Sequence, residues 1–498
     1  MNASADAHSE FSAETADSPH ERTAIAILFF CFVITLPLLN PWVRGDGIGY
    51  YAFARSILIE HKLDFTEDYL HANPGFREAH VDASGEIRKE FYTRTGHLDN
   101  HFTVGPAILW SPFLVVAHGG VLAARAFGSS VSADGFSAPY RVAMAFGTAV
   151  YGFLGLLLSF RLALKYAGCR YALLATVGIW WASSLLFYMY FNPSWSHAHS
   201  AFTVAAFLSW WQSSRGERTA LQWIVLGCLA GLMLNVYYAN ALVLTAPLVE
   251  AFQQYYRKLK SSPSDFRVAL RLFQRHVLFC AVILLCLLPT FASRKVIYGS
   301  PLETGYVSLR DWLWKSPVLL QVLVSSDHGL FSWTPILFLA AAGLFLLAFR
   351  QPRNGGPLLA SALAFYLFIA CYPDWDGLAS YGNRFFVSLT PFFVLGLAVT
   401  LEQFAKRFRR ERAGAAAVSG MLGVLILWNC GLLFQWATHL IPVRGPIPWS
   451  VMVRNQFVTV PRMAGQGLRA YFLHRSALMK GIEQKDIEQM KSQPPNPR

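Results

Sequence analysis

The sequence is poor in charged residues. Asp, Glu, Lys and Arg make up 14% of its 498 residues, whereas soluble domains carry about 25%. Hydrophobic residues make up 54% and aromatic residues 15%, and they are gathered in many separate runs. This composition excludes an ordinary soluble domain and predicts an all-α polytopic membrane protein.

Paired cysteines are also lacking. The chain has seven cysteines and no C-x-x-C pair, so neither a zinc site nor a disulfide framework is indicated. The first apolar run has no small-residue cleavage site, so we expect a retained helix and not a signal peptide. The net charge of +13 does not indicate a nucleic-acid partner, because the basic residues cluster in short loops, as they do in cytoplasmic loops.

The apolar runs mark the predicted membrane helices. A helix needs about 20 residues to cross a bilayer, and crowded bundles tolerate shorter ones, so the sequence predicts about eleven spans. They are residues 23–39, 140–162, 171–191, 195–211, 221–236, 239–252, 277–292, 331–349, 357–372, 385–401 and 415–436.

Positive charge in the loops sets the predicted orientation, because Lys and Arg are enriched on the cytoplasmic side. Basic turns occur at 161–170, 215–218, 257–275, 350–353 and 406–412. They alternate with nearly uncharged turns and with longer polar loops. We therefore predict a disordered cytoplasmic amino terminus (1–22), a transmembrane domain (23–440) and an extracytoplasmic tail (441–498), in which 451–472 lies on the membrane surface.

The first extracytoplasmic loop is predicted to be long, at residues 44–139, and to carry juxtamembrane helices. Its apolar segment 102–126 is interrupted by Pro106, Pro112 and two glycines. If this segment crossed the membrane, the basic turn at 161–170 would lie outside. We therefore predict that it forms a re-entrant or interfacial helix.

The stretch Arg44-Gly45-Asp46-Gly47-Ile48-Gly49 follows the first span, so Asp46 lies where a membrane helix meets water. Placing a carboxylate inside lipid costs free energy, whereas just outside the lipid this cost is small, so this position suits a functional acid at the membrane face. The glycines would let the backbone approach a ligand closely, and residues 48–63 are expected to form an amphipathic helix. An alternative is a membrane-exit turn whose charges only anchor the first helix.

The predicted outer loops hold most of the unusual polar residues. His197 and His199 are not at the i, i+4 spacing of two ligands on one helix face, so polar groups at a helix start are favoured over a metal site. Asp327 and His328 are adjacent in a loop expected to be extended. Their side chains should then point in opposite directions and should not act on each other.

Two further candidates lie in the loop before the span at 385–401. Asp374 and Asp376 would share one face of an extended segment, which suits a divalent cation or a hydroxyl-rich ligand. Arg384 follows Asn383 at the start of the span, and it is either a snorkelling anchor or a phosphate ligand. The aromatic residues between these groups form an interfacial belt or stack on sugar rings.

Two motifs carry a resemblance to a known family. The first is Asp46-Gly47-Ile48-Gly49-Tyr50-Tyr51-Ala52-Phe53-Ala54-Arg55, and the second is Val104-Gly105-Pro106-Ala107-Ile108-Leu109-Trp110. With these motifs the chain resembles, over most of its length, the integral-membrane glycosyltransferases of the C-type fold. The group in question contains the protein O-mannosyltransferases and the lipid A aminoarabinose transferases.

The chain departs from that group at three places. Gly47 stands where the mannosyltransferases have a second acid, and the proline-containing loop lacks a basic residue. The loop with His197 and His199 stands where the aminoarabinose transferases have another aspartate. The metal requirement and the acceptor therefore stay open.

The resemblance implies a donor sugar on a polyprenyl phosphate, presented from the outer leaflet. We expect inverting transfer of a hexosyl or pentosyl group to a lipid, glycan or protein acceptor, with Asp46 as general base. The candidates for binding the donor phosphate are Arg384, Arg55 and Lys295. The candidates for binding substrate are Tyr50, His101, His197, His199, His328, Asp374, Asp376 and Asn383.

A divalent cation stays open as a cofactor, with no ligands assigned. The expected location is a bacterial inner membrane, with multiple spans, surrounding membrane lipids as partners and the active site on the extracytoplasmic side. The main alternative is a transporter or flippase of lipid-linked saccharides, in which the same aromatic and charged residues line a path. A second alternative is a non-catalytic assembly protein whose outer loops bind a partner.

Overall fold

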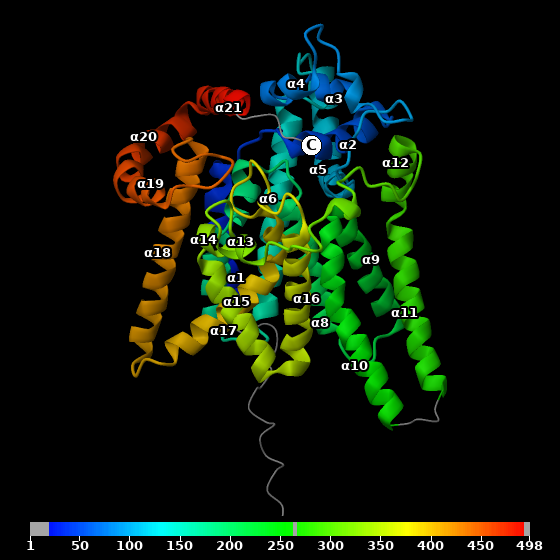
Figure 1. The fold of residues 1–498 in the computed structure, drawn as a ribbon, viewed down its shortest axis with the longest axis vertical. Coiled ribbons are helices and arrows are strands. Elements are labelled where there is room, and N and C mark those ends of the chain that lie inside the picture. Colours follow the sequence, from blue (N-terminus) through cyan, green and yellow to red (C-terminus); the bar gives the residue numbers. More distant parts are fainter. Residues whose placement is uncertain (1–18, 262–265, 493–498) are drawn as a thin grey trace, which may run out of the picture.

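The structure is a computed structural model, and it describes residues 19–261 and 266–492. In these two ranges the named elements are helices, and extended residues pair only in the isolated bridges Val81–Ile87 and Tyr92–Leu98. The predicted all-α fold class is confirmed. Long helices run side by side along the long axis of the molecule, and shorter helices cover one end of the bundle (Figure 1).

Seven helical segments of the described residues are long and apolar enough to cross a membrane, judged by length and composition. The elements concerned are α1 (Pro19–Thr35) with η1 (Leu36–Leu38), α5 (Gly105–Ala126), α6 (Ala138–Ala163), α11 (Phe266–Cys286), α16 (Pro352–Cys371), η7 (Arg384–Leu389) with α17 (Thr390–Ala405), and α18 (Glu411–Ala437). The chain is therefore an integral membrane protein.

Shorter helices occupy the remaining predicted spans. They are α7 (Cys169–Trp181) with the π-helical turn η4 (Phe187–Phe191), α8 (His197–Ser213), α9 (Ala220–Val236), η5 (Tyr238–Leu244) with α10 (Thr245–Ser261), and α14 (Leu330–Trp333) with α15 (Ile336–Arg350). Each span expected from the sequence thus has a helix at its position. The connections contain η3 (Lys89–Phe91), α12 (Leu288–Tyr298), η6 (Leu309–Asp311) and α13 (Leu319–Val324).

Helix α17 lies at the centre of the bundle. Of the window that qualifies Arg384–Ala405 as a span, 89% is buried inside the protein, against 17% for the window on α11. Small residues allow α17 to pack closely on α15, because a Cβ atom at Gly343 would lie 1.8 Å from the carbonyl oxygen of Gly396. Such small-residue contacts are typical of helix pairs in membranes.

A cap covers the end of the bundle at which α17 begins (Figure 1). It contains α2 (Asp46–Arg55), the π-helical turn η2 (Ser56–Glu60), α3 (Thr66–Leu70) and α4 (Pro74–His80). The part of the predicted amphipathic helix that forms α2 has no polar exposed face, because residues 47–55 are all buried. Helix α5 packs on α2, and Phe102 and Ser194 lie against its glycines at 49 and 47.

The carboxyl-terminal tail completes the cap with α19 (Trp449–Arg454), η8 (Asn455–Thr459), α20 (Val460–Leu473) and α21 (Arg475–Ser492). Helix α21 packs on α4. There Glu483 accepts hydrogen bonds from the Asn73 side chain (2.5 Å) and from the Gly75 backbone N–H (2.7 Å). Asp486 pairs with Arg44 at 2.9 Å. The tail is therefore tied to the residues that precede Asp46.

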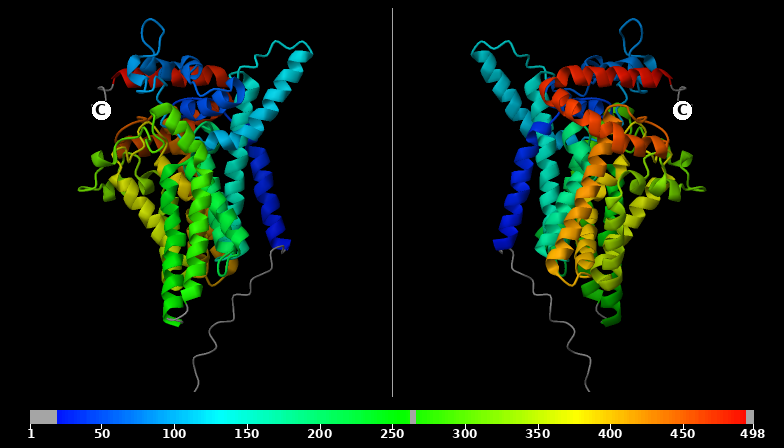
Figure 2. Two further views of the ribbon diagram at one scale, coloured as in Figure 1. Left: turned by 90° about the vertical axis from the view of Figure 1, so that its right-hand side faces the viewer. Right: turned by 90° about the vertical axis from the view of Figure 1, so that its left-hand side faces the viewer.

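Helix α5 differs from the other long helices in direction. Figure 2 shows it slanting outward from the capped end of the bundle, and the loop that follows returns to the start of α6 at that same end. Its length and apolar composition would permit a crossing. The path in Figure 2 agrees with the expectation that α5 does not cross, which stays a prediction.

The basic turns gather at the opposite end of the bundle, where α10 ends and α11 begins (Figure 1). This arrangement agrees with the predicted orientation, in which Asp46 faces the outside. Of the predicted disordered terminus at 1–22, residues 1–18 lie outside the described residues, and α1 begins at Pro19. The division of the chain at residues 23, 44, 139 and 440 stays a prediction.

Candidate functional site

Asp46 and Arg384 form an ion pair between Oδ2 of the carboxylate and Nη1 of the guanidinium. Asp46 is the first residue of α2 in the cap, and Arg384 is the first residue of η7 above α17. The Asp46 side chain is 31% exposed and the Arg384 side chain 13%. The pair therefore lies at the boundary between cap and bundle, where solvent still reaches the carboxylate.

The glycines beside Asp46 permit close packing against the loop before α8. A Cβ atom at Gly47 would lie 2.0 Å from Ser194 Oγ. Gly45 has φ +54°, and a Cβ atom there would lie 3.2 Å from the Trp195 ring. The Trp195 indole N–H donates to the Arg44 carbonyl oxygen at 3.0 Å. The expectation that these glycines make room for a ligand was wrong, because protein side chains fill that room.

Arg384 is held between aromatic rings. Its guanidinium carbon lies 4.6 Å from the centre of the Trp195 ring, and cations bind to aromatic faces at such distances. Its Nε is buried and has no hydrogen-bond partner within the described residues, and the same holds for the side-chain oxygens of Ser194 and Asn383. Buried polar groups are normally satisfied. The unused donor on Arg384 therefore points to a ligand with acceptor atoms, such as a phosphate.

His197 belongs to the same site, and His199 does not. His197 is buried beside the rings of Tyr188 (4.6 Å) and Trp195 (5.9 Å), and its Nδ1 has no partner among the described residues. His199 lies on a different side of α8, against Trp110 (5.1 Å) and Tyr151 (5.6 Å). Both are in the first turn of α8, as expected, but residues two apart on a helix point in different directions.

Tyrosines surround the ion pair on the cap side. Tyr50 receives a hydrogen bond from Ser196 Oγ at 3.0 Å, and burial followed by the charge of Asp46 raises the pKa of its hydroxyl. Burial and the neighbouring Tyr50 also raise the pKa of Tyr237 and of Tyr306. These hydroxyls are therefore neutral hydrogen-bond donors at physiological pH, which suits the recognition of hydroxyl-rich groups.

A second cluster contains Asp327, His328 and Asp376. One ligand atom from each residue lies within 4.8 Å of the others. The expectation that Asp327 and His328 do not act on each other was wrong, because His328 Nδ1 lies 3.1 Å from Asp327 Oδ1. The loop is not extended there: His328 has a left-handed backbone (φ 55°), which turns the two side chains to the same side. Burial and the charge of Asp327 raise the pKa of Asp376.

Asp374 is not part of this cluster. Residues 374–377 form a turn in which the Gly377 N–H donates to the Asp374 carbonyl at 2.9 Å, so the extended pairing of Asp374 with Asp376 does not occur. The same turn brings the cluster close to the ion pair. A Cβ atom at Gly377 would lie 3.4 Å from Arg384 Nε. Asn383 supports the turn, because its side-chain nitrogen donates to the Trp375 carbonyl at 3.0 Å.

Arg55 was expected as a phosphate ligand, and the structure assigns it to carboxylates instead. Its Nε and Nη2 donate to the two carboxylate oxygens of Asp68 at 2.7 and 2.8 Å, and its Nη1 donates to Glu60 at 2.6 Å. The side chain is 1% exposed. A guanidinium with three such bonds is a structural tie within the cap.

Lys295 was also expected near the phosphate, but its ammonium donates to the Gly299 carbonyl at 3.0 Å on an exposed side of α12. Its neighbour Arg294 is the buried cation. Arg294 donates to the carbonyls of Asn100 (3.1 Å), His101 (2.6 Å) and Phe102 (2.9 Å). It thereby holds the loop of His101, whose ring lies 4.8 Å from Tyr306. The sequence did not indicate this role of Arg294. It also did not indicate that Ser194 and Trp195 pack against residues 44–47.

No protein-family model and no curated protein matches the sequence. A solved structure of ArnT from Cupriavidus metallidurans, bound to undecaprenyl phosphate, is similar at 15% identity with a TM-score of 0.50. The alignment covers 94% of this chain and 74% of that one. The apo state of the same protein has a TM-score of 0.49 at 15% identity, with the same coverage.

The similarity concerns the fold. ArnT is a lipid A aminoarabinose transferase of the C-type glycosyltransferase fold. The fold expected from the two sequence motifs is therefore confirmed. An identity of 15% does not carry activity or substrate from one protein to another, because one fold hosts many functions.

Proposed function

We propose that this protein is a membrane glycosyltransferase that moves a sugar from a polyprenyl-phosphate donor to an acceptor at the outer face of the membrane. One observation carries the proposal: Asp46 and Arg384, an acid and a guanidinium with an unused buried donor, meet at the mouth of the bundle. The fold shared with ArnT, whose structure holds undecaprenyl phosphate, supports it.

Asp46 acts in this proposal as the general base that takes the proton of the acceptor hydroxyl. Its place at the first turn of α2 and its 31% exposed side chain leave it within reach of an incoming hydroxyl. The acceptor oxygen attacks the anomeric carbon from the face opposite the leaving phosphate, so the C–O bond to the phosphate breaks as the new bond forms and the configuration is inverted. Asp46 takes the hydroxyl proton as that bond forms.

Arg384 stabilises the negative charge that develops on the leaving phosphate. A guanidinium can bridge two anions, because it offers five donors in a fixed plane. Its Nη1 is paired with Asp46, and its buried Nε is unpaired within the described residues. The centres of the Trp195 and Phe385 rings lie 4.6 and 5.4 Å from its guanidinium carbon. The low polarity of this setting strengthens its attraction to phosphate.

The lipid chain of the donor has an apolar cavity available. A cavity of about 280 Å³ lies between η1, η4, α18, α20 and α21, and a second one of about 230 Å³ reaches Gly45 and Trp195. Arg44, Trp436, Val443 and Asp486 line both cavities. A polyprenyl chain in the first cavity would therefore lead toward Trp195 and the ion pair.

A divalent cation fits the cluster of Asp327, His328 and Asp376. Two carboxylates and an imidazole whose Nε2 is buried and unpartnered among the described residues are a suitable donor set for such ions. A cation held there would add positive charge near the donor phosphate. His197, Tyr50 and Asn383 then bind sugar hydroxyls. His101 also binds sugar hydroxyls, and Arg294 holds the loop that carries it.

The test is a transfer assay in lipid nanodiscs with a radiolabelled polyprenyl-phosphate sugar and an envelope extract as acceptor source. We expect labelled product and free polyprenyl phosphate with the native chain and neither with Asp46→Asn. Movement of the donor across liposome membranes without any transfer would contradict the proposal and favour a flippase.

A further inference from the structure

A large basic cavity lies at the end of the bundle opposite Asp46. It has a volume of about 700 Å³ and opens between α8, α9, α10, α11 and the start of α16. Its lining includes seven basic residues, Arg215, Arg218, Arg257, Lys258, Arg271, Arg275 and Arg353, and only two acidic ones, Glu217 and Glu250. The volume is that of a ligand pocket, and the charge inside it is positive.

Basic loops at this end are expected from topology alone, but topology does not account for Arg218. Its side chain is 1% exposed, and its Nη1 has no hydrogen-bond partner in the described part of the chain. Topology requires positive charge in the loops, and exposed side chains would meet that requirement. A buried guanidinium with an unused donor in the wall of a cavity indicates an anionic ligand.

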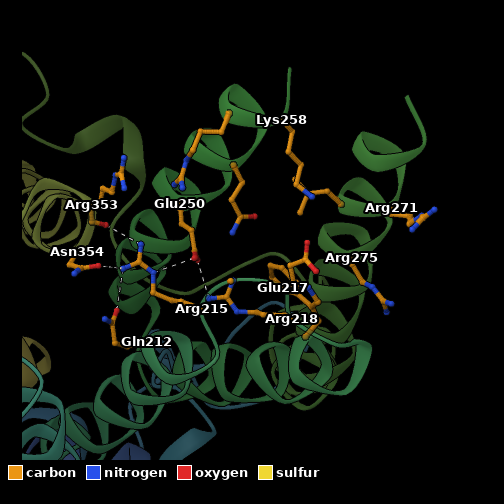
Figure 3. A pocket seen from close by; sticks show the side chains of 15 residues that line it. Gln212, Arg215, Glu217, Arg218, Glu250, Lys258, Arg271, Arg275, Arg353 and Asn354 are labelled. Carbon is orange, nitrogen blue, oxygen red and sulfur yellow. Dashed lines mark hydrogen bonds and ion pairs between the residues drawn. The ribbon is translucent and has the colours of Figure 1, made fainter. Parts of the chain in front are cut away.

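Glu250 does not neutralise the cavity. It accepts from Arg218 Nη2 at 3.0 Å and from Arg215 Nε at 3.3 Å. Arg215 is further fixed by Asn354 Oδ1 (2.9 Å) and the Arg353 carbonyl (3.0 Å). Figure 3 shows this network on one wall, with Lys258 on the far side of the opening. Arg215 and Arg218 are therefore held in place, and most of the positive charge of the lining remains for a ligand.

The flanks of the cavity expose large apolar side chains. Helix α10 exposes Phe252 and Tyr256 next to Arg257, and α11 exposes Leu270 and Phe273 on either side of Arg271. Large apolar side chains exposed on membrane helices lie against acyl chains, while arginines at the helix ends reach the headgroup layer. A ligand with both an anionic head and acyl chains would use both surfaces. A soluble phosphate would use the basic wall alone.

We propose that this cavity binds the phosphate-bearing headgroup of an anionic membrane lipid from the leaflet at the basic end. Basic pockets between membrane helices are known to hold such headgroups. The proposal concerns a site separate from Asp46 and does not depend on the proposed transferase activity.

The test uses the full chain in neutral detergent, with cardiolipin as the lipid probe and inorganic pyrophosphate as the soluble probe. Affinity for cardiolipin is measured by native mass spectrometry, and thermal stability by the midpoint of unfolding. The test variant is Arg257→Gln/Arg353→Gln, which removes two exposed cationic groups and spares the buried Arg218. The control variant is Arg409→Gln/Arg410→Gln, which removes two exposed arginines of another basic turn.

We expect the native chain and the control variant to bind cardiolipin alike, and the test variant to bind it about tenfold more weakly. Cardiolipin should raise the unfolding midpoint of the native chain, whereas pyrophosphate should leave it unchanged. Equal affinity in all three proteins would overturn the proposal, and so would equal weakening in both variants. If pyrophosphate stabilised the native chain as much as cardiolipin does, the lipid proposal would be overturned and a soluble phosphate would be the indicated ligand.

Discussion

The Asp46 carboxylate and the Arg384 guanidinium form an ion pair although 338 positions separate the two residues in the chain. Asp46 belongs to the cap and Arg384 to the helical turn above the central helix α17. The pair therefore joins the two parts of the fold and is also the proposed chemical centre. A substitution at either residue has to be judged by folding and by chemistry separately.

Asp46→Asn should lower kcat by about 10²–10⁴-fold, the usual contribution of a general base. The amide has the size of the native side chain, and its oxygen can still accept the hydrogen bond from Arg384, but it cannot take a proton. Turnover is measured per folded molecule, with thermal stability as the folding control. Turnover within about threefold of the native value would rule out a base contribution of this size, and a rise in KM alone would indicate a binding role.

Arg384→Lys should reduce kcat/KM by about tenfold or more, because the ammonium keeps the charge but loses the planar donor set. Lys315→Ala is the control, since Lys315 is an exposed cation in the loop before α13. Donor turnover of both variants is compared at equal amounts of folded protein. Near-native activity in both would show that Arg384 is only an anchor.

Gly47→Ala should destabilise the protein by about 1–3 kcal/mol, as overpacking does in tight interiors. The new methyl group would lie 2.0 Å from Ser194 Oγ. Gly119→Ala in α5 is the control, because nothing lies within 4 Å of a Cβ atom there. Ser194→Gly in the Gly47→Ala background should restore part of the lost stability. A thermal midpoint unchanged by Gly47→Ala would show that the loop before α8 can shift to accommodate the methyl group without loss of stability.

Manganese should stabilise the protein more strongly as the pH rises. The pKa of Asp376 is raised by burial and by Asp327, so the folded state holds this proton more tightly than the unfolded chain does. The stability that this proton contributes is present at low pH and is lost as the pH rises through the raised pKa. A cation bound to ionised carboxylates replaces the proton, so its effect grows over the same range.

The measurement is the unfolding midpoint with Mn²⁺ and with EDTA, between about pH 5 and 8. Asp376→Asn should remove the difference between the two conditions, and Asp374→Asn, outside the cluster, should keep it. A manganese effect that survives Asp376→Asn would place the cation elsewhere.

Membrane sidedness can be tested with single cysteines in a cysteine-free background. Ser84 in the cap, Ser132 after α5 and Arg409 in a basic turn are all exposed. An impermeant thiol reagent should label Ser84→Cys and Ser132→Cys in intact cells, and Arg409→Cys only after permeabilisation. Labelling of Ser132→Cys only after permeabilisation would show that α5 crosses the membrane.

Properties that depend on local composition were predictable from the sequence. The membrane class, the positions of the helices and the basic end follow from runs of apolar residues and from charges near them. The choice of Asp46 and Arg384 as candidates came from their places beside predicted spans. The aromatic residues between the polar groups of these loops were also apparent in the sequence, but an interfacial belt could not be distinguished from rings that stack on sugars.

Errors arose where the answer depends on partners distant in the chain. Residues 48–63 showed an amphipathic pattern, yet α2 is buried on all sides because α5 packs on it and Ser194 lies against Gly47. Arg55 was expected to be free for phosphate, but Asp68 and Glu60 occupy its donors. The glycines at 45 and 47 allow close packing of Trp195 and Ser194, respectively. No local pattern encodes these neighbours.

By itself, the sequence determined the membrane nature of this protein, its helical spans and its basic end, because hydropathy and loop charge act through short stretches of chain. Only the tertiary structure decided which polar groups meet. It paired Asp46 with Arg384, brought Asp376 to Asp327 and His328, and separated His199 from His197. The physical reason is that close packing of α17 and the cap fixes side-chain positions to within ångströms, whereas spacing along the chain leaves them open.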